Sequence, residues 1–208
     1  GLISDVVINS TGITRFSAPV EVGHLVISGS VNSFDDTTPN FLETTNDGQV
    51  TLGGDVGAGH ALSNLTVNAG SGGLLNINTG IIKTTGDQSY NKPVVLGNAP
   101  VGAATSGAVN LVSTQAGDIH FSSTLDGANA LTINTAGGTY FHDAVGHGTA
   151  LTSLTTDLHA GLALTDKVYI QGGSVATTDG QTYGEAVHMS LATTLTASAV
   201  TFDKAVIG

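Results

Sequence analysis

The sequence lacks cysteine and has very few positive charges. With no cysteine among 208 residues, disulfide bonds and thiolate metal sites are excluded. Lys and Arg together number 5 against 16 Asp and Glu, which gives a formal net charge of -11. Nucleic-acid affinity depends on many Lys and Arg contacts to phosphate, and anionic membranes attract the same residues. We therefore expect no nucleic-acid partner and no anionic membrane partner.

Long apolar runs and helical patterns are also missing. No run approaches the length of a membrane span, so we expect no membrane insertion. Glu and Lys are scarce, 29 residues are Gly, and apolar residues never recur with the 3.6-residue period of a capped helix. Short alternating runs such as Ile119-His120-Phe121 and Val168-Tyr169-Ile170 are present instead, each ended by Gly, Asn, Asp or Ser. They predict an all-β protein with many short strands.

A five-residue unit recurs along the chain: an aromatic residue, two variable residues, Ala or Pro, and then Val. Complete copies begin at Phe16, Tyr90, Phe141, Tyr183 and Phe202, and degenerate copies cover 52–56, 121–125 and 164–168. From residue 121 onward the copies begin 20, 23, 19 and 19 residues apart. A longer duplication relates residues 84–90 to residues 177–183. Recurrence at this spacing is typical of a repeat architecture.

Units of about twenty residues with two or three strands suit one coil of a parallel β-solenoid. Short strands alone would equally suit a sandwich or a barrel, and the repeat disfavours both. We expect a parallel β-helix of roughly ten coils of about 20 residues. It forms one repetitive unit over residues 1–208, with weaker repeats in 1–49 and clearer repeats in 50–208.

The aromatic residue and the Val of each unit are expected to face inward, one on each side of a corner. Ala or Pro before the Val suits a corner, because a small side chain or a preset φ lets the chain turn. Equivalent residues should stack from coil to coil as one core ladder. The predicted ladder is Phe16, Val20, Leu52, Val56, Tyr90, Val94, Phe121, Leu125, Phe141, Val145, Leu164, Val168, Tyr183, Val187, Phe202 and Val206.

Neither end of the sequence carries a recognisable cap. Residues 202–208 stop within a unit, and reading from Ile207-Gly208 into Gly1-Leu2 would complete the pattern. We expect a piece of a longer polypeptide or a subunit that stacks end to end, and an arbitrary boundary is an equal alternative. The predicted end-to-end interface is Leu2, Ile3, Val6, Ile8, Phe202, Val206 and Ile207.

No residue pattern predicts a catalytic, metal or cofactor site. His142-Asp143 with His147 does not force three or four zinc ligands to converge. Asp35-Asp36 with Asp47 lacks the nonapeptide of calcium-loaded β-rolls. Polysaccharide cleavage requires paired carboxylates, and the Asp and Glu residues are isolated on different units. We therefore expect no enzymatic activity and no cofactor.

Residues 84–96, 118–127 and 192–202 resemble the repeats of large bacterial filamentous-haemagglutinin-type exoproteins. The likeness covers most of residues 50–208. It implies a right-handed β-helix that is exported across the outer membrane and displayed as a long adhesin or filament. The amino-terminal secretion domain of that family is not evident, and no catalytic residue is carried over.

The expected function is that of a structural shaft segment or stacking subunit of a secreted, cell-surface fibre. Its expected partners are further copies or the continuing chain, together with a host or matrix glycan or protein receptor. The alternative is a carbohydrate-binding or polysaccharide-cleaving β-helix, which predicts outward aromatic residues and clustered carboxylates. Most aromatic residues belong to the inward unit, and this disfavours the alternative.

Overall fold

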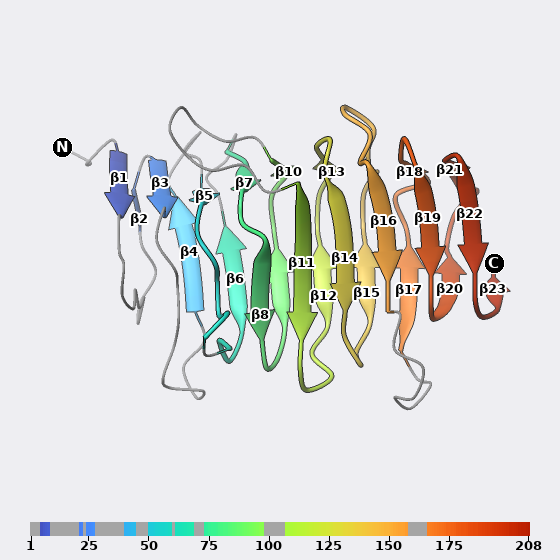
Figure 1. The fold of residues 1–208 in the computed structure, drawn as a ribbon, viewed down its shortest axis with the longest axis horizontal. Coiled ribbons are helices and arrows are strands. Elements are labelled where there is room, and N and C mark those ends of the chain that lie inside the picture. The colour runs from blue at the N-terminus through green and yellow to red at the C-terminus, as the bar shows by residue number, and fades with distance from the viewer. Residues whose placement is uncertain are drawn as a thin grey trace.

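The computed structural model describes residues 5–8, 21–22, 24–27, 40–44, 50–59, 61–68, 73–97, 107–157 and 166–208, with side chains from residue 50 onward. These residues form 23 strands and no helix (Figure 1). Every described strand pair is parallel, and its partners lie on neighbouring passes of the chain.

The strands form three sheets. Sheet I contains β1 (Asp5–Ile8), β3 (His24–Ile27), β5 (Val50–Leu52), β7 (Leu75–Ile77), β10 (Val94–Leu96) and β13 (Leu125–Asp126). Single bridges from Leu125 through Val145 to Val175 continue it to β18 (Ser174–Ala176) and β21 (Thr194–Thr196). Sheet II contains β8 (Ile81–Thr84), β11 (Ala108–Ser113), β14 (Ala130–Asn134), β16 (Ser153–Thr156), β19 (Gly180–Tyr183) and β22 (Ala199–Phe202). Sheet III contains β2 (Glu21–Val22), β4 (Asn40–Thr44), β6 (Leu65–Asn68), β9 (Gln88–Tyr90), β12 (Ile119–Phe121), β15 (Thr139–Phe141), β17 (Lys167–Ile170), β20 (Ala186–Met189) and β23 (Val206–Ile207).

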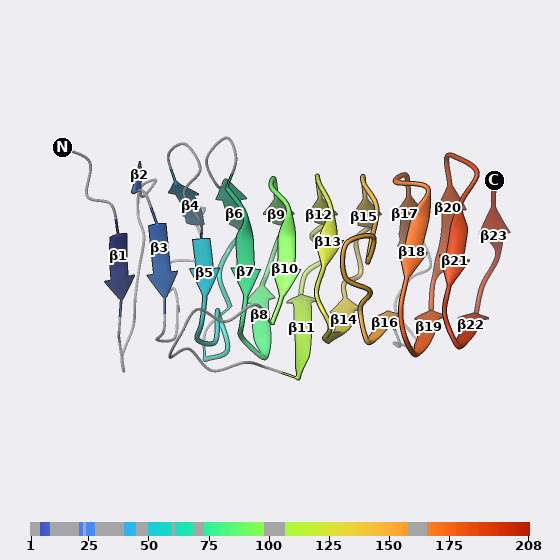
Figure 2. The same ribbon diagram turned by 90° about the horizontal axis from the view of Figure 1, so that it is seen from above.

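From β7 onward the chain visits sheets I, II and III in turn, and each circuit makes one coil (Figure 2). The coils progress along the long axis, with β1 and β23 at opposite ends (Figure 1). The protein is therefore an all-β parallel solenoid, as predicted, and neither a sandwich nor a barrel. The predicted ten coils are not confirmed, because sheet III has nine strands and sheet II has six.

Alternation along each strand builds the core. In β12, β14 and β17 buried residues alternate with residues of intermediate exposure, so one face of each strand points into the coil. The predicted ladder residues that are at most 1 % exposed are Leu52, Val56, Tyr90, Val94, Phe121, Leu125, Phe141, Val145, Val168, Tyr183 and Val187. Phe16, Val20 and Leu164 lie outside the described residues. Phe202 and Val206 lie in the last coil.

The aromatic units occupy more than one corner, so the single register predicted for them is wrong. Tyr90, Phe121 and Phe141 stack in sheet III, with ring centroids 5.1 and 5.4 Å apart, and the next residue of that column is Ile170. Tyr183 stacks instead on Phe202 in sheet II, at 5.2 Å. The physical reason is that the unit encodes a corner. Four residues carry the chain from one inward position to the next wherever two sheets meet, whichever two they are.

The longer duplication also encodes a corner, with a buried glutamine at its centre. Gln88 donates its amide to the carbonyl of Val112 at 3.0 Å and to the hydroxyl of Thr84 at 3.2 Å. The hydroxyl of Tyr90 donates to Gln88 Oε1 at 2.7 Å. In the second copy Gln181 donates to the carbonyls of Val175 and Thr196, and Tyr183 donates to Gln181 Oε1. The duplication therefore repeats one hydrogen-bond network at two different corners.

Polar side chains join successive coils at the corner that precedes sheet III. Asn64 Oδ1 accepts the backbone N–H of Asp87 at 2.7 Å. Asp87 Oδ1 accepts that of Asp118, and Asp118 Oδ1 accepts that of Gly138. Each side chain thus satisfies a backbone donor of the next coil, which would otherwise have no partner in the turn.

Candidate functional site

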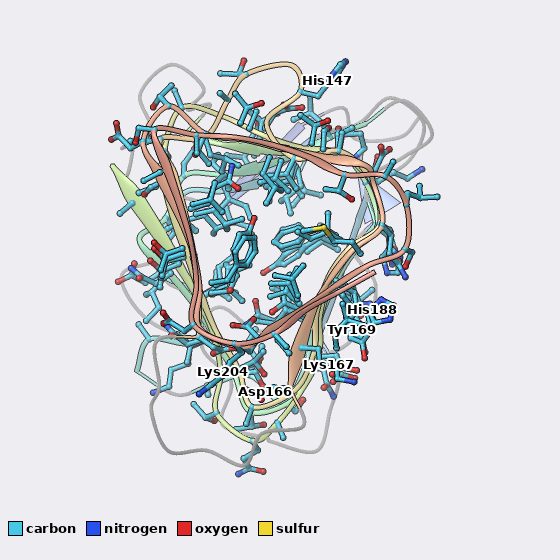
Figure 3. The ribbon with its side chains drawn as sticks, turned by 90° about the vertical axis from the view of Figure 1, so that its right-hand side faces the viewer. His147, Asp166, Lys167, Tyr169, His188 and Lys204 are labelled. Atoms are coloured by element: carbon cyan, nitrogen blue, oxygen red, sulfur yellow. The ribbon has the colours of Figure 1, made fainter. Side chains whose placement is uncertain are left out.

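The C-terminal coil leaves the apolar interior of the rod open at one end. Val200, Phe202 and Val206 lie on Gln181, Tyr183 and Val187 of the coil before. Those three neighbours are at most 1 % exposed, whereas Val200 is 37 % and Val206 is 48 % exposed. Phe202 and Leu195 are half-buried against the core. Figure 3 looks along the axis onto this end.

The predicted end-to-end interface lies partly within the exposed apolar cross-section of the C-terminal coil. Phe202 and Val206 belong to the open cross-section, while Ile207 pairs with His188 and is 40 % exposed. At the other end Val6 and Ile8 belong to β1, the edge strand of sheet I, and their side chains are not described. Leu2 and Ile3 lie outside the described residues. Leu191, which the sequence did not single out, is the most exposed large apolar residue near this end at 61 %.

A stripe of rings runs along the outer face of sheet III, and the sequence analysis missed it. His120, Tyr140, Tyr169 and His188 stand in register on β12, β15, β17 and β20. Their ring centroids are 4.2, 4.5 and 5.7 Å apart in that order. Tyr169 and His188 point outward from the coil (Figure 3). Each of these residues directly precedes or follows an inward ladder position, which is the signal that could have revealed the stripe.

Stacking along the axis limits what this stripe can bind. The planes of Tyr140 and Tyr169 differ by 3° and those of His120 and Tyr140 by 8°, so each ring face meets the ring of the next coil. Solvent therefore meets ring edges, hydroxyls and imidazole nitrogens. A sugar that stacks on an aromatic residue requires a free ring face, and the interior of the stripe offers none.

The histidines form a pair rather than a metal centre. His120 Nδ1 lies 3.3 Å from His142 Nε2, with ring centroids 5.6 Å apart and planes 7° apart. The nitrogens therefore face each other head-on, which suits one shared proton. Burial lowers the pKa of His120, the charge of Asp118 opposes this, and His142 reinforces it. His147 lies on another side of the coil (Figure 3). Within the described ranges no three His, Asp or Glu side chains are grouped to hold a metal ion.

Two buried carboxylates meet where sheet II turns into sheet III. Asp157 directly follows β16 and Glu185 lies between β19 and β20, on the next coil. Asp157 is 8 % and Glu185 is 4 % exposed. Asp157 also lines a depression of about 230 Å³ together with Ser113, Asn134, Thr135 and Asp166. No pattern in the sequence marks this pair, because the two acids stand 28 residues apart.

Burial dominates the electrostatics of the pair. Burial raises the pKa of Asp157 to about 7, against the lowering effect of a hydrogen bond from Thr135 N–H, and the charge of Asp166 raises it further. Burial raises the pKa of Glu185 to about 8, with Asp157 adding to the rise and the hydroxyl of Thr156 opposing it. The pair therefore holds protons near neutral pH.

Asp35, Asp36 and Asp47 lie outside the described residues. None of the described residues belongs to an apolar helix of membrane-spanning length. Comparison of the sequence with protein-family models and with curated proteins, and of the fold with solved structures, finds no match for this chain.

Proposed function

We propose that the chain is a structural segment of an extracellular fibre or adhesin, in which β-solenoid coils stack end to end. The observation that carries the proposal is the apolar column that continues from coil to coil into the last described coil. Val206 is 48 % exposed where its neighbour one coil inward, Val187, is fully buried. One further coil on this end would bury Val200, Phe202 and Val206 in the same way, and the gain is about 25 cal/mol per Å² of apolar surface.

The occupant that we propose for this end is a further coil of the same kind, supplied either by the continuation of the same chain or by the N-terminal coil of a second copy. Sheet III runs from the edge strand β2 to the edge strand β23, and all its pairs are parallel. Head-to-tail addition of a second copy continues such a sheet without reversing any strand. The contact is heterologous, because different surfaces meet, and heterologous contacts that do not close into a ring produce filaments.

The finer features of the proposal rest on chain topology and on the repeat resemblance. Coils of parallel strands joined by crossovers follow the right-handed sense that such connections almost always take. We propose roughly ten such coils over the whole chain. The likeness of residues 84–96 and 118–127 to filamentous-haemagglutinin-type repeats supports secretion and display at a bacterial surface. A glycan or protein receptor and the absence of catalytic activity belong to the same proposal.

A carbohydrate-cleaving β-helix is the second candidate, and the carboxylate pair favours it. Asp157 and Glu185 have the raised pKa values that glycosidase acids need. Asp157 Oδ2 and Glu185 Oε1 are, however, closed to solvent, so a glycosidic oxygen does not reach them in this structure. A fibre segment therefore fits the arrangement better.

Electron microscopy of the purified chain over a range of concentrations tests the proposal. We expect rods whose lengths are multiples of one chain and increase with concentration. Val206→Lys should shorten them to single units, because it places an ammonium in the apolar contact. Thr201→Lys is the matched control, since Thr201 lies in the same coil on the outer column of Thr182 and is already exposed. Dispersed single rods of the unsubstituted chain at every concentration would refute stacking.

A further inference from the structure

Asp157 and Glu185 each have one carboxylate oxygen that accepts a hydrogen bond and one that has no partner. Asp157 Oδ1 accepts the backbone N–H of Thr135 at 2.6 Å, and Glu185 Oε2 accepts the hydroxyl of Thr156 at 3.0 Å. The second oxygen of each group, Asp157 Oδ2 and Glu185 Oε1, is buried and has no hydrogen-bond partner. Two neighbouring coils thus each leave one buried carboxylate oxygen without a hydrogen-bond partner at this corner.

Burying these two carboxylates costs free energy unless a positive charge compensates them. Both side chains are more than nine-tenths buried, and an uncompensated buried carboxylate loses its hydration without replacement. In the described part of the chain no Lys or Arg forms a salt bridge with either group. Asp166 on the same depression adds a third negative charge nearby.

We propose that Asp157 and Glu185 bind a divalent cation of the calcium class at the corner between sheets II and III. Hard cations of this class take oxygen ligands, and both carboxylates offer a free oxygen. Calcium lies about 2.3–2.6 Å from its ligands, which is closer than a water molecule approaches an oxygen. Oxygens closed to water can therefore still contact a bare cation. Asn134 lines the depression beside Asp157, next to this corner. The site is independent of the proposed end-to-end stacking.

Thermal unfolding of the whole chain at about pH 8, in Ca²⁺ and in EDTA, tests the site. A cation that binds only the folded chain should raise Tm by about 5–10 °C at a hundredfold excess over its Kd. Glu185→Gln should abolish the Ca²⁺ gain. Asp203→Asn should keep it, because Asp203 is exposed at the same corner one coil further on. At about pH 5 the gain should shrink in the unsubstituted chain, because protons compete for the same oxygens.

Terbium luminescence supplies a readout that needs no variant. Tb³⁺ replaces Ca²⁺ at oxygen sites. Tyr183, two residues from Glu185, is the aromatic residue that would sensitise the Tb³⁺ emission. We expect one ion per chain, displaced by Ca²⁺. Equal Tm values in Ca²⁺ and EDTA, an equal Ca²⁺ gain in Glu185→Gln, or Tb³⁺ binding without saturation would each overturn the proposal. The pair would then be completed by protons alone.

Discussion

Replacing the buried Gln88 with Met tests the corner network quantitatively. Gln88 and Tyr90 are both fully buried, and the Gln88 amide joins β9 to the carbonyl of Val112 on the next coil. Met fills a similar volume but neither donates to that carbonyl nor accepts from the Tyr90 hydroxyl. Each buried polar group left without a partner costs about 1–3 kcal/mol. The Tyr90 hydroxyl is then orphaned, whereas the Val112 carbonyl loses the Gln88 donor but stays in the ladder with β8, so we expect a loss of about 2–4 kcal/mol in the free energy of unfolding.

Urea unfolding followed by circular dichroism measures this loss, and a double-mutant cycle identifies its origin. Tyr90→Phe alone should cost about 1–2 kcal/mol. Combined with Gln88→Met it should add little, because the orphaned hydroxyl is gone, so the two losses should be non-additive by about 1–2 kcal/mol. Gln181→Met should behave like Gln88→Met, since the same network recurs there. A loss below about 1 kcal/mol for Gln88→Met, or strict additivity, would refute the reasoning.

Three further predictions concern the acid pair, the close packing of coils and the open end. In EDTA the raised pKa values of Asp157 and Glu185, about 7 and about 8, mean that the folded chain binds more protons than the unfolded chain. The stability they contribute is present below about pH 4 and is lost as the pH rises to about 8, by up to about 4 kcal/mol for each acid. Glu185→Gln should flatten this dependence in Tm measurements, and an unchanged slope would contradict it. Gly172→Ala should lower the free energy of unfolding in urea by at least about 2 kcal/mol, because the new Cβ would collide with the backbone of Asp143. Gly180→Ala should be nearly neutral, because the nearest atom to its Cβ would lie at 3.8 Å. Equal losses for the two variants would argue against this packing. Val206→Lys should lower the sedimentation coefficient of assembled material at high protein concentration. It should lower Tm by no more than about 1 °C, because Val206 is 48 % exposed. An unchanged sedimentation coefficient would count against the end contact.

The sequence was sufficient to predict the solenoid because its core follows local rules. Alternation in runs such as 119–121 and 168–170 gives strands, and the four-residue step from Phe141 to Val145 gives a corner. The three corners accept the same unit, however, so the unit does not say which corner it occupies. The column of Phe141 continues at Ile170 rather than at Leu164, because the connections between strands differ in length from coil to coil.

The candidate sites depend on that register and therefore escaped prediction. Tyr140 and Tyr169 stack across 29 residues, while His120 and Tyr140 stack across 20, so no fixed spacing marks the stripe. Asp157 and Glu185 become neighbours only once Thr156 is paired with Tyr183. A pattern of side chains identifies inward positions, whereas a site needs the alignment of successive coils.

Disulfide trapping tests the stacking of coils most directly, because the chain has no cysteine of its own. Thr155 and Thr182 are partners on adjacent coils, where in-register Cα atoms lie about 4.8 Å apart, within the range that a disulfide spans. Thr132 pairs with Thr155 and so lies two coils from Thr182, about 9.6 Å away. On mild oxidation, we predict that cysteines at 155 and 182 crosslink within one chain and that cysteines at 132 and 182 stay reduced. Crosslinking of the second pair, or failure of the first in folded protein, would contradict the parallel solenoid.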